Sequence, residues 1–284
     1  MNILDALLHS LEHPLVETLK MTPILFLAYL LMEWLEHHES SKLMGLVNKS
    51  RRVGPLLGSA LGLIPQCGFS GAIAGMYAAG TVTAGTLLAV ILATSDEMLP
   101  LMLGARLSAG LIAAVLVLKF LVGTITGFAA DLFLKKRHKE NSEHIHEFCR
   151  QENCSCKDGV WFSALKHTLK ILLIIYIVSV VLHFVLELVP EEVIKNALNF
   201  PFLSQIAAGL VGLIPSCAVS VTLTQLYIEG TLGIAPLMCG LLTNGGVGLL
   251  VLYRVNKNRR DNLYITLTIF VAGVIFGSLS ALIL

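Results

Sequence analysis

Two short stretches place cysteine and hydroxyl side chains beside a proline inside long apolar runs. Residues 62–67 read Gly-Leu-Ile-Pro-Gln-Cys, and residues 212–217 read Gly-Leu-Ile-Pro-Ser-Cys, with a serine three positions after each cysteine. Proline lacks an amide hydrogen and ends a helix, so a second helix can begin after each motif with free amide groups. Thiols are soft metal ligands, and helix N-termini favour anions. The alternative is that the cysteines pack as small apolar side chains.

These two motifs supply the first set of candidate ligands. Their side chains are expected to contact a substrate at Gln66, Cys67, Ser70, Ser216, Cys217 and Ser220. The thiols of Cys67 and Cys217 are also candidate ligands of a transported metal ion.

A second polar feature interrupts the apolar run that follows each motif. Residues 93–97 read Ala-Thr-Ser-Asp-Glu, and residues 243–246 read Thr-Asn-Gly-Gly. A charged residue deep inside a membrane span is costly and is functional by default. We expect unwound helix at both places, with substrate contacts at Thr94, Asp96, Glu97, Thr243 and Asn244. Of these, Asp96, Glu97 and Asn244 are candidate metal ligands. The alternative places both carboxylates near the outer interface, paired with Arg106.

Histidine and cysteine also crowd a polar segment in the middle of the chain. The side chains that could capture a metal ion there are His144, His146, Cys149, Cys154 and Cys156. Their spacing fits no zinc finger. The segment is therefore interpreted as a loose metal-capture loop or, alternatively, as a flexible solvated linker.

The elements that carry these residues are too apolar for a water-soluble protein. The chain has 284 residues, of which 55% are hydrophobic and 14% charged, whereas soluble domains carry about 25% charged residues. Apolar runs of a length that crosses a bilayer lie at 21–36, 107–133, 169–188 and 264–284, and two interrupted ones at 83–103 and 232–253. We expect an all-α polytopic membrane protein, without a cleaved signal peptide.

The charges of the polar gaps predict an orientation. Lys and Arg are concentrated in residues 38–54, 134–166 and 254–261, whereas residues 189–203 contain two glutamates and one lysine. The positive-inside rule places the first three gaps in the cytoplasm and the fourth outside. The motif segments 55–80 and 204–230 must then enter and leave on one side, each as a re-entrant broken-helix hairpin. A single proline-kinked helix is the alternative.

The sequence repeats itself at a constant offset. Pro65 and Pro215 are 150 positions apart, and the same offset aligns Tyr77 with Tyr227. Each half has three spans and one hairpin, and because three is odd the second half is inverted, as in many secondary transporters. The predicted domains are a first membrane repeat at 1–134, a cytoplasmic linker at 135–166 and an inverted second repeat at 167–284.

At the paired Gly-Leu-Ile-Pro-x-Cys motifs and the Thr-Ser-Asp stretch, the sequence resembles the ten-span heavy-metal exporter family. Its members are labelled arsenic efflux proteins or manganese transporters. The resemblance covers nearly the whole chain, and ten spans match six crossings plus four hairpin arms. It implies export of a metal or metalloid.

The function expected is secondary transport at the cell inner membrane. A divalent transition or heavy metal such as manganese suits the carboxylate, amide and hairpin oxygens, and Asp96 or Glu97 could exchange protons. An arsenite or oxyanion exporter is the alternative, since thiols and helix N-termini suit such a substrate. No Walker or hydrolase motif is present, so an enzyme is not expected. Beyond the transported ion no cofactor is expected; the partners are the lipid bilayer and a small inorganic ion, not nucleic acid, with a homodimer left open.

Overall fold

The computed structural model describes residues 53–64, 68–95, 98–134 and 203–282, with isolated helical positions, one or two at a time, between 15 and 30 and between 161 and 180. Within these residues every regular element is an α-helix. Four helical stretches are long and apolar enough to cross a membrane, namely Ala84–Gly104, Ala109–Phe133, Ile234–Val255 and Arg259–Ser280. The predicted all-α membrane protein is therefore confirmed.

The described helices form two matching series. The first half contains α3 (Gly54–Gly62), α4 (Gly68–Ala78), α5 (Ala84–Ala93), α6 (Met98–Gly104) and α7 (Ala109–Leu134). The second half contains α11 (Leu203–Gly212), α12 (Cys217–Ile228), α13 (Ile234–Thr243), α14 (Gly246–Val255) and α15 (Arg259–Ser280). Adding 150 to both bounds of α5 gives those of α13. The turns before α5 and α13 match too, because Gly80 and Gly230 both have a φ of 75°, which favours glycine.

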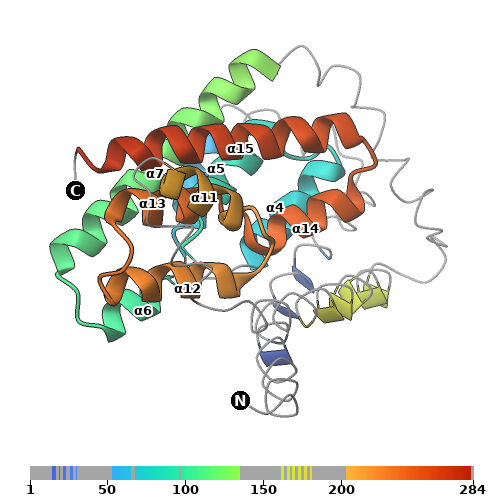
Figure 1. Cartoon of the computed structure of the whole chain (residues 1–284). Helices are drawn as coiled ribbons and strands as arrows, with labels where there is room; N and C mark the ends of the chain where they lie inside the picture. Colours follow the sequence, from blue (N-terminus) through green and yellow to red (C-terminus); the bar gives the residue numbers. More distant parts are fainter. Residues whose placement is uncertain are drawn as a thin grey trace.

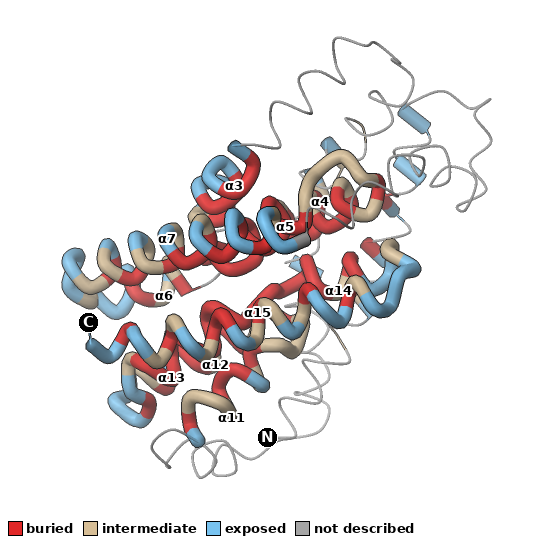
Figure 2. The backbone as a smooth tube through the Cα atoms, turned by 90° about the horizontal axis from the view of Figure 1, so that it is seen from above, coloured by how far each residue is buried: buried red, intermediate tan, exposed pale blue. Residues whose placement is uncertain are grey.

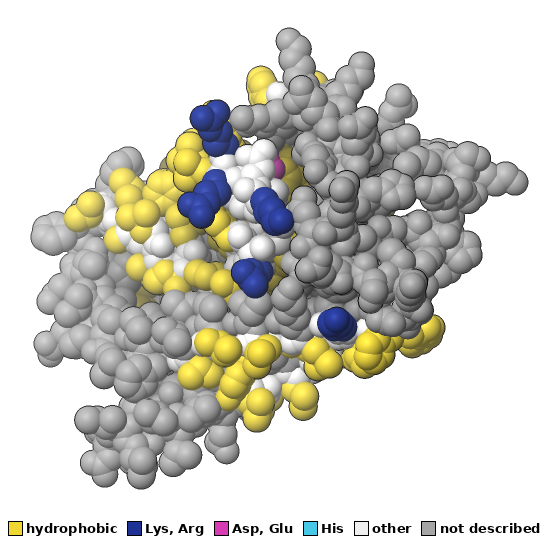
Figure 3. Space-filling view, turned by 90° about the vertical axis from the view of Figure 1, so that its right-hand side faces the viewer, with side chains coloured by type: hydrophobic (Ala, Val, Ile, Leu, Met, Phe, Trp, Pro, Cys, Tyr) yellow, Lys and Arg dark blue, Asp and Glu magenta, His cyan; other side chains and the backbone are white. Residues whose placement is uncertain are grey.

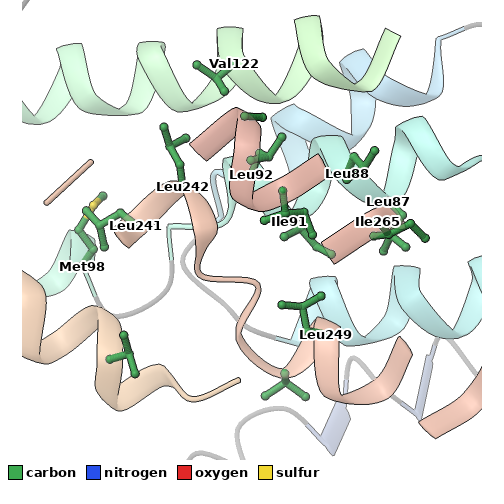
Figure 4. Packing of buried hydrophobic residues seen from close by; sticks show 14 of the residues in the cluster. Leu87, Leu88, Ile91, Leu92, Met98, Val122, Leu241, Leu242, Leu249 and Ile265 are labelled. Atoms are coloured by element: carbon green, nitrogen blue, oxygen red, sulfur yellow. The ribbon is translucent and has the colours of Figure 1, made fainter. Parts of the chain in front are cut away.

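Helices α5 and α13 lie at the centre of the molecule. All ten residues of α5 are buried, as are residues 235–243 of α13. Helices α3, α5 and α7 pack together on one side, and α11, α13 and α15 on the other (Figure 2). Leucines from both central helices, among them Leu92 and Leu242, join one hydrophobic cluster (Figure 4). A helix that is buried all round belongs to the interior of the bundle.

Helices α7 and α15 present apolar side chains outward. The exposed residues of α7 recur every three or four positions at Val117, Leu121, Ile125, Phe128 and Leu132. Those of α15 recur every four positions at Leu263, Leu267, Val271, Ile275 and Leu279. Such stripes lie on one helix face. In a membrane they face lipid, which leaves the central helices to build the interior.

Glycines let each outer helix approach its central helix closely. A Cβ at Gly127 of α7 would lie 2.6 Å from the carbonyl oxygen of Gly85 in α5. A Cβ at the matching Gly277 of α15 would lie 2.5 Å from the backbone nitrogen of Cys239 in α13. Small residues allow such backbone contact between membrane helices. The repeat therefore reproduces the packing of its helices as well as their bounds.

The two halves are joined by exchanged contacts. Helix α4 of the first half contacts α14 of the second, and α12 of the second half contacts α6 of the first (Figure 1). In each case the second helix of a motif segment packs against the helix that follows the polar interruption in the opposite half. A hydrogen bond also joins α4 to the second half, since the hydroxyl of Tyr77 in α4 donates to Oδ2 of Asp261 in α15 over 2.5 Å. Asn256 donates to the same carboxylate oxygen over 3.1 Å.

Several sequence predictions about topology are not tested by these residues. The predicted spans at 21–36 and 169–188 lie largely outside the described residues, as does the linker at 135–166. Each motif segment is a helix, a break and a second helix, with the second helices beginning at Gly68 and Cys217, as expected. Re-entry on one side of the bilayer, inversion of the second half and the domain boundaries stay predictions.

Candidate functional site

The first helix break follows α5 and is held against the end of α3. Thr94 caps α5 with a φ of −54° and a ψ of 126°, which leave the helical region. Its hydroxyl donates to the carbonyl of Val90 over 2.7 Å. The amide of Ser95 donates to the carbonyl of Gly62, the last residue of α3, over 3.2 Å. This peptide segment is therefore fixed by the first motif segment, and the chain resumes as α6.

The second break follows α13 and has an equivalent arrangement. Asn244 caps α13 with a φ of −71° and a ψ of 96°, and its Oδ1 accepts a hydrogen bond from the amide of Gly246 over 3.0 Å. The hydroxyl of Thr243 donates to the carbonyl of Cys239 over 2.9 Å. The end of α11 packs here, since a Cβ at Gly212 would lie 2.1 Å from that hydroxyl.

The two predicted unwound stretches are therefore confirmed as helix breaks at the centre of the fold. They also lie close to each other, because a Cβ at Gly245 would come within 3.3 Å of Cγ2 of Ile91 in α5. A break at this depth leaves carbonyl groups without helical partners. Non-helical backbone inside a membrane is tolerated where it is buried in protein or lines a cavity.

A buried lysine joins the two breaks. Lys119 of α7 is only 1% exposed, and its ammonium donates to the carbonyl of Thr94 and, over 3.2 Å, to the carbonyl of Leu241. Thr94 ends α5, and Leu241 lies in the last turn of α13. Helix C-termini carry negative partial charge, so one ammonium serves helix ends from both halves.

Sequence reasoning missed Lys119, although the signal for it was present. It is the one charged residue between Leu111 and Ala130, ten positions after Ala109, the first residue of α7, or about 15 Å along the helix. That places it near the middle of a hydrocarbon layer about 30 Å thick. The rule that marks Asp96 and Glu97 as functional, a charge deep in a span, therefore marks Lys119 as well.

The motif serines Ser70, Ser216 and Ser220 are among the described residues. Ser216 caps α12, with its Oγ accepting from the amide of Ala218 over 3.2 Å. Ser70 and Ser220 are both buried. Ser70 packs on α14, since a Cβ at Gly248 would lie 2.8 Å from its Cβ. The structure thus brings Ser70 to the opposite half's broken helix.

The remaining predicted ligands are not placed. Outside the described residues lie Gln66, Cys67, Asp96, Glu97, His144, His146, Cys149, Cys154 and Cys156. The backbone of Cys217 begins α12, but its side chain is not described. Among the residues that are described, no three His, Cys, Asp or Glu side chains gather as a metal site. The ligand roles of all these residues, and the pairing of Arg106, stay predictions.

The described atoms around the breaks are mostly hydrogen-bond acceptors. The hydroxyl hydrogens of Thr94 and Thr243 are used on backbone carbonyls. The amide of Ala218, in the first turn of α12, and that of Gly246, the first of α14, are bonded to the side chains of Ser216 and Asn244. Oxygen atoms with unused lone pairs suit a hard cation, and capped amides are not available to an anion.

Comparison with known proteins agrees with this architecture. Residues 4–191 match one protein family, and no curated protein and no solved structure matches the chain. The matched residues include the first motif, the first helix break and Lys119. With more than half of its length matched, the chain belongs to the family described as "Putative, 10TM heavy-metal exporter".

Proposed function

We propose that the protein is a secondary transporter of the cell inner membrane that exports a divalent transition or heavy metal such as manganese in exchange for protons. The observation that carries this proposal is the ammonium of Lys119, bound between backbone carbonyls at the ends of α5 and α13. A positive charge is already held at the centre of the fold by atoms that also coordinate metal ions. Unwound carbonyls and half-helix C-termini coordinate cations in other secondary transporters.

Cation transport fits the polarity of the site better than anion transport does. Export of an oxyanion would need free hydrogen-bond donors, yet the amides of Ala218 and Gly246 are satisfied by neighbouring side chains. Asp96 is two positions beyond Thr94, so the Cα atoms of these residues are at most about 7 Å apart. Its carboxylate or that of Glu97 would complete an oxygen-ligand set for manganese and carry the exchanged proton.

The second candidate is a metalloid exporter. It is favoured by the matched cysteines of the two motifs, Cys67 and Cys217, because thiols bind arsenite-type species better than they bind manganese. Both motifs begin beside the helix breaks, at Gly62 and Gly212, so the thiols and the carbonyls could serve one pathway. Competition between the two substrates on the purified protein separates these candidates.

The orientation follows from the exposed basic turn between α14 and α15. Four of its side chains are exposed, at Arg254, Lys257, Arg259 and Arg260, and basic side chains gather on one face of the molecule beside hydrophobic ones (Figure 3). The positive-inside rule places this turn in the cytoplasm. Single cysteines introduced at positions 145 and 195 should then label from opposite sides, whereas labelling from the same side would contradict the inverted repeat.

Transport in reconstituted vesicles tests the function itself. The purified chain should move Mn²⁺ across the membrane without ATP, at a rate that rises with an opposing proton gradient and collapses when the gradient is dissipated. Arsenite and arsenate should neither be transported nor inhibit. Transport of arsenite with no movement of Mn²⁺ or other divalent metals would establish the second candidate instead. Movement that ignores the proton gradient would rule out exchange.

A further inference from the structure

The position of Lys119 within the fold is unusual for a structural lysine. Among the described residues it is the largest fully buried side chain, and it lies in the middle of a helix whose outer face is apolar. Its ammonium reaches inward past α5 to a carbonyl of α13, which is 122 positions away in the chain. A side chain that only anchored α7 to α5 would need no partner in the opposite half.

The two carbonyls form a position selected for positive charge. Thr94 lies at the end of α5 and Leu241 in the last turn of α13, so both contribute the negative end of a helix dipole. A metal ion entering between the breaks would be attracted to the same two oxygen atoms. A divalent cation and an ammonium cannot share them, since like charges at contact distance repel strongly in a buried site.

We propose that Lys119 is a tethered occupant of the transport site, and that its ammonium and the transported cation bind the Thr94 and Leu241 carbonyls in alternation. In the cargo-free state the ammonium satisfies both helix ends and keeps the two breaks together. When the metal ion binds, it replaces the ammonium at these oxygens. Lys119 thus sets cargo affinity and release. This inference rests on the proposed function, because it needs a cationic cargo.

The repeat supplies a matched control for this idea. The position equivalent to Lys119 in α15 is Ile269, which is also completely buried. The second half therefore holds an apolar side chain where the first half holds the ammonium. Replacing either residue by methionine puts the same unbranched apolar side chain at equivalent places, and only one of the two substitutions removes a charge from the carbonyls.

The test is equilibrium binding of Mn²⁺ alone to the purified full chain, with Lys119→Met compared with Ile269→Met. Without the competing ammonium, Lys119→Met should bind Mn²⁺ at least tenfold more tightly than the parent, and it should transport Mn²⁺ more slowly because release is impaired. Ile269→Met should bind as the parent does. Equal or weaker binding by a folded Lys119→Met would overturn the proposal. So would an equal gain in both variants, which would indicate a packing effect.

A measurement on the parent protein keeps the proposal testable if Lys119→Met does not fold. Reductive methylation followed by mass spectrometry should label Lys119 several-fold more when Mn²⁺ is bound, because the displaced ammonium leaves its carbonyls. Labelling of the exposed Lys257 should not change. Unchanged labelling of Lys119 at saturating Mn²⁺ would refute the alternation.

The same experiments separate failure of this inference from failure of the proposed function. If the parent binds and transports Mn²⁺ but Lys119→Met binds it no better, only the inference is wrong. If neither protein binds any divalent cation, both are wrong. If only Lys119→Met binds the ion, the ammonium is confirmed as a competitor at the site.

Discussion

Replacing Gly127 by alanine should destabilise the protein by crowding the contact between α7 and α5. The new Cβ would lie 2.6 Å from the carbonyl oxygen of Gly85, 2.8 Å from Cβ of Pro55 and 3.0 Å from Cβ of Ala89. None of these atoms can move by a side-chain rotation, so the helices must separate. Overpacking of this kind costs about 1–3 kcal/mol.

A second glycine of the same helix provides the control. Nothing lies within 4 Å of a Cβ built at Gly110, so alanine there changes helix propensity without a clash. Alanine favours helix over glycine by up to about 1 kcal/mol, and Gly127→Ala receives the same benefit. The difference between the two variants therefore isolates the steric term, about 1–3 kcal/mol in favour of Gly110→Ala.

Thermal unfolding in detergent measures this difference. A change of 1 kcal/mol shifts the melting temperature of a domain of 150–250 residues by about 2–4 °C, so the gap between the variants should be about 2–12 °C. The repeat extends the prediction to Gly277→Ala, whose Cβ would lie 2.5 Å from the backbone nitrogen of Cys239. If Gly127→Ala unfolds at or above the temperature of Gly110→Ala, the close approach of α7 and α5 is wrong.

Three further sets of substitutions probe the junction between the halves and the site. Tyr77→Phe removes the hydrogen bond to Asp261 and should lower the unfolding free energy by about 1–2 kcal/mol. Tyr227→Phe, at the equivalent position, should lower it less, and equal losses would contradict a specific contribution of this bond. Asp96→Asn should stop metal transport in vesicles while the protein stays folded. If this variant transports metal as fast as the parent, the role of Asp96 is structural. Serine in place of either motif cysteine should lower the affinity for thiophilic ions such as Cd²⁺ more than the affinity for Mn²⁺ in binding assays. Unchanged selectivity would show that the thiols are not ligands. These motif cysteines are Cys67 and Cys217.

The helix breaks could be predicted because their signals are local. Thr94 and Asn244 stand in polar interruptions of otherwise apolar runs, and a polar residue in such a run marks a change of backbone. The offset of 150 was equally visible, since identical residues at a constant spacing need no knowledge of the fold. The structure reproduces both, with α5 and α13 ending at equivalent positions.

The pairing of Lys119 with its carbonyls could not be predicted in the same way. The two carbonyls are backbone atoms, which every residue has, so no side-chain pattern points to Thr94 or Leu241. One lysine in a run as apolar as α7 also leaves the hydropathy of the span high. The exchanged contacts between α4 and α14 and between α12 and α6 are likewise a property of the assembled halves.

One departure from symmetry at this centre has a physical reason. Because the halves repeat, two helix C-termini converge, and each adds negative partial charge to one small volume. One ammonium can satisfy both ends, as Lys119 does. By the repeat, a lysine at position 269 would bring a second ammonium toward the same pair of helix ends, and like charges close together in a buried site repel each other. A scaffold of two equivalent halves around one shared cation position therefore favours one lysine and one apolar residue at positions 119 and 269.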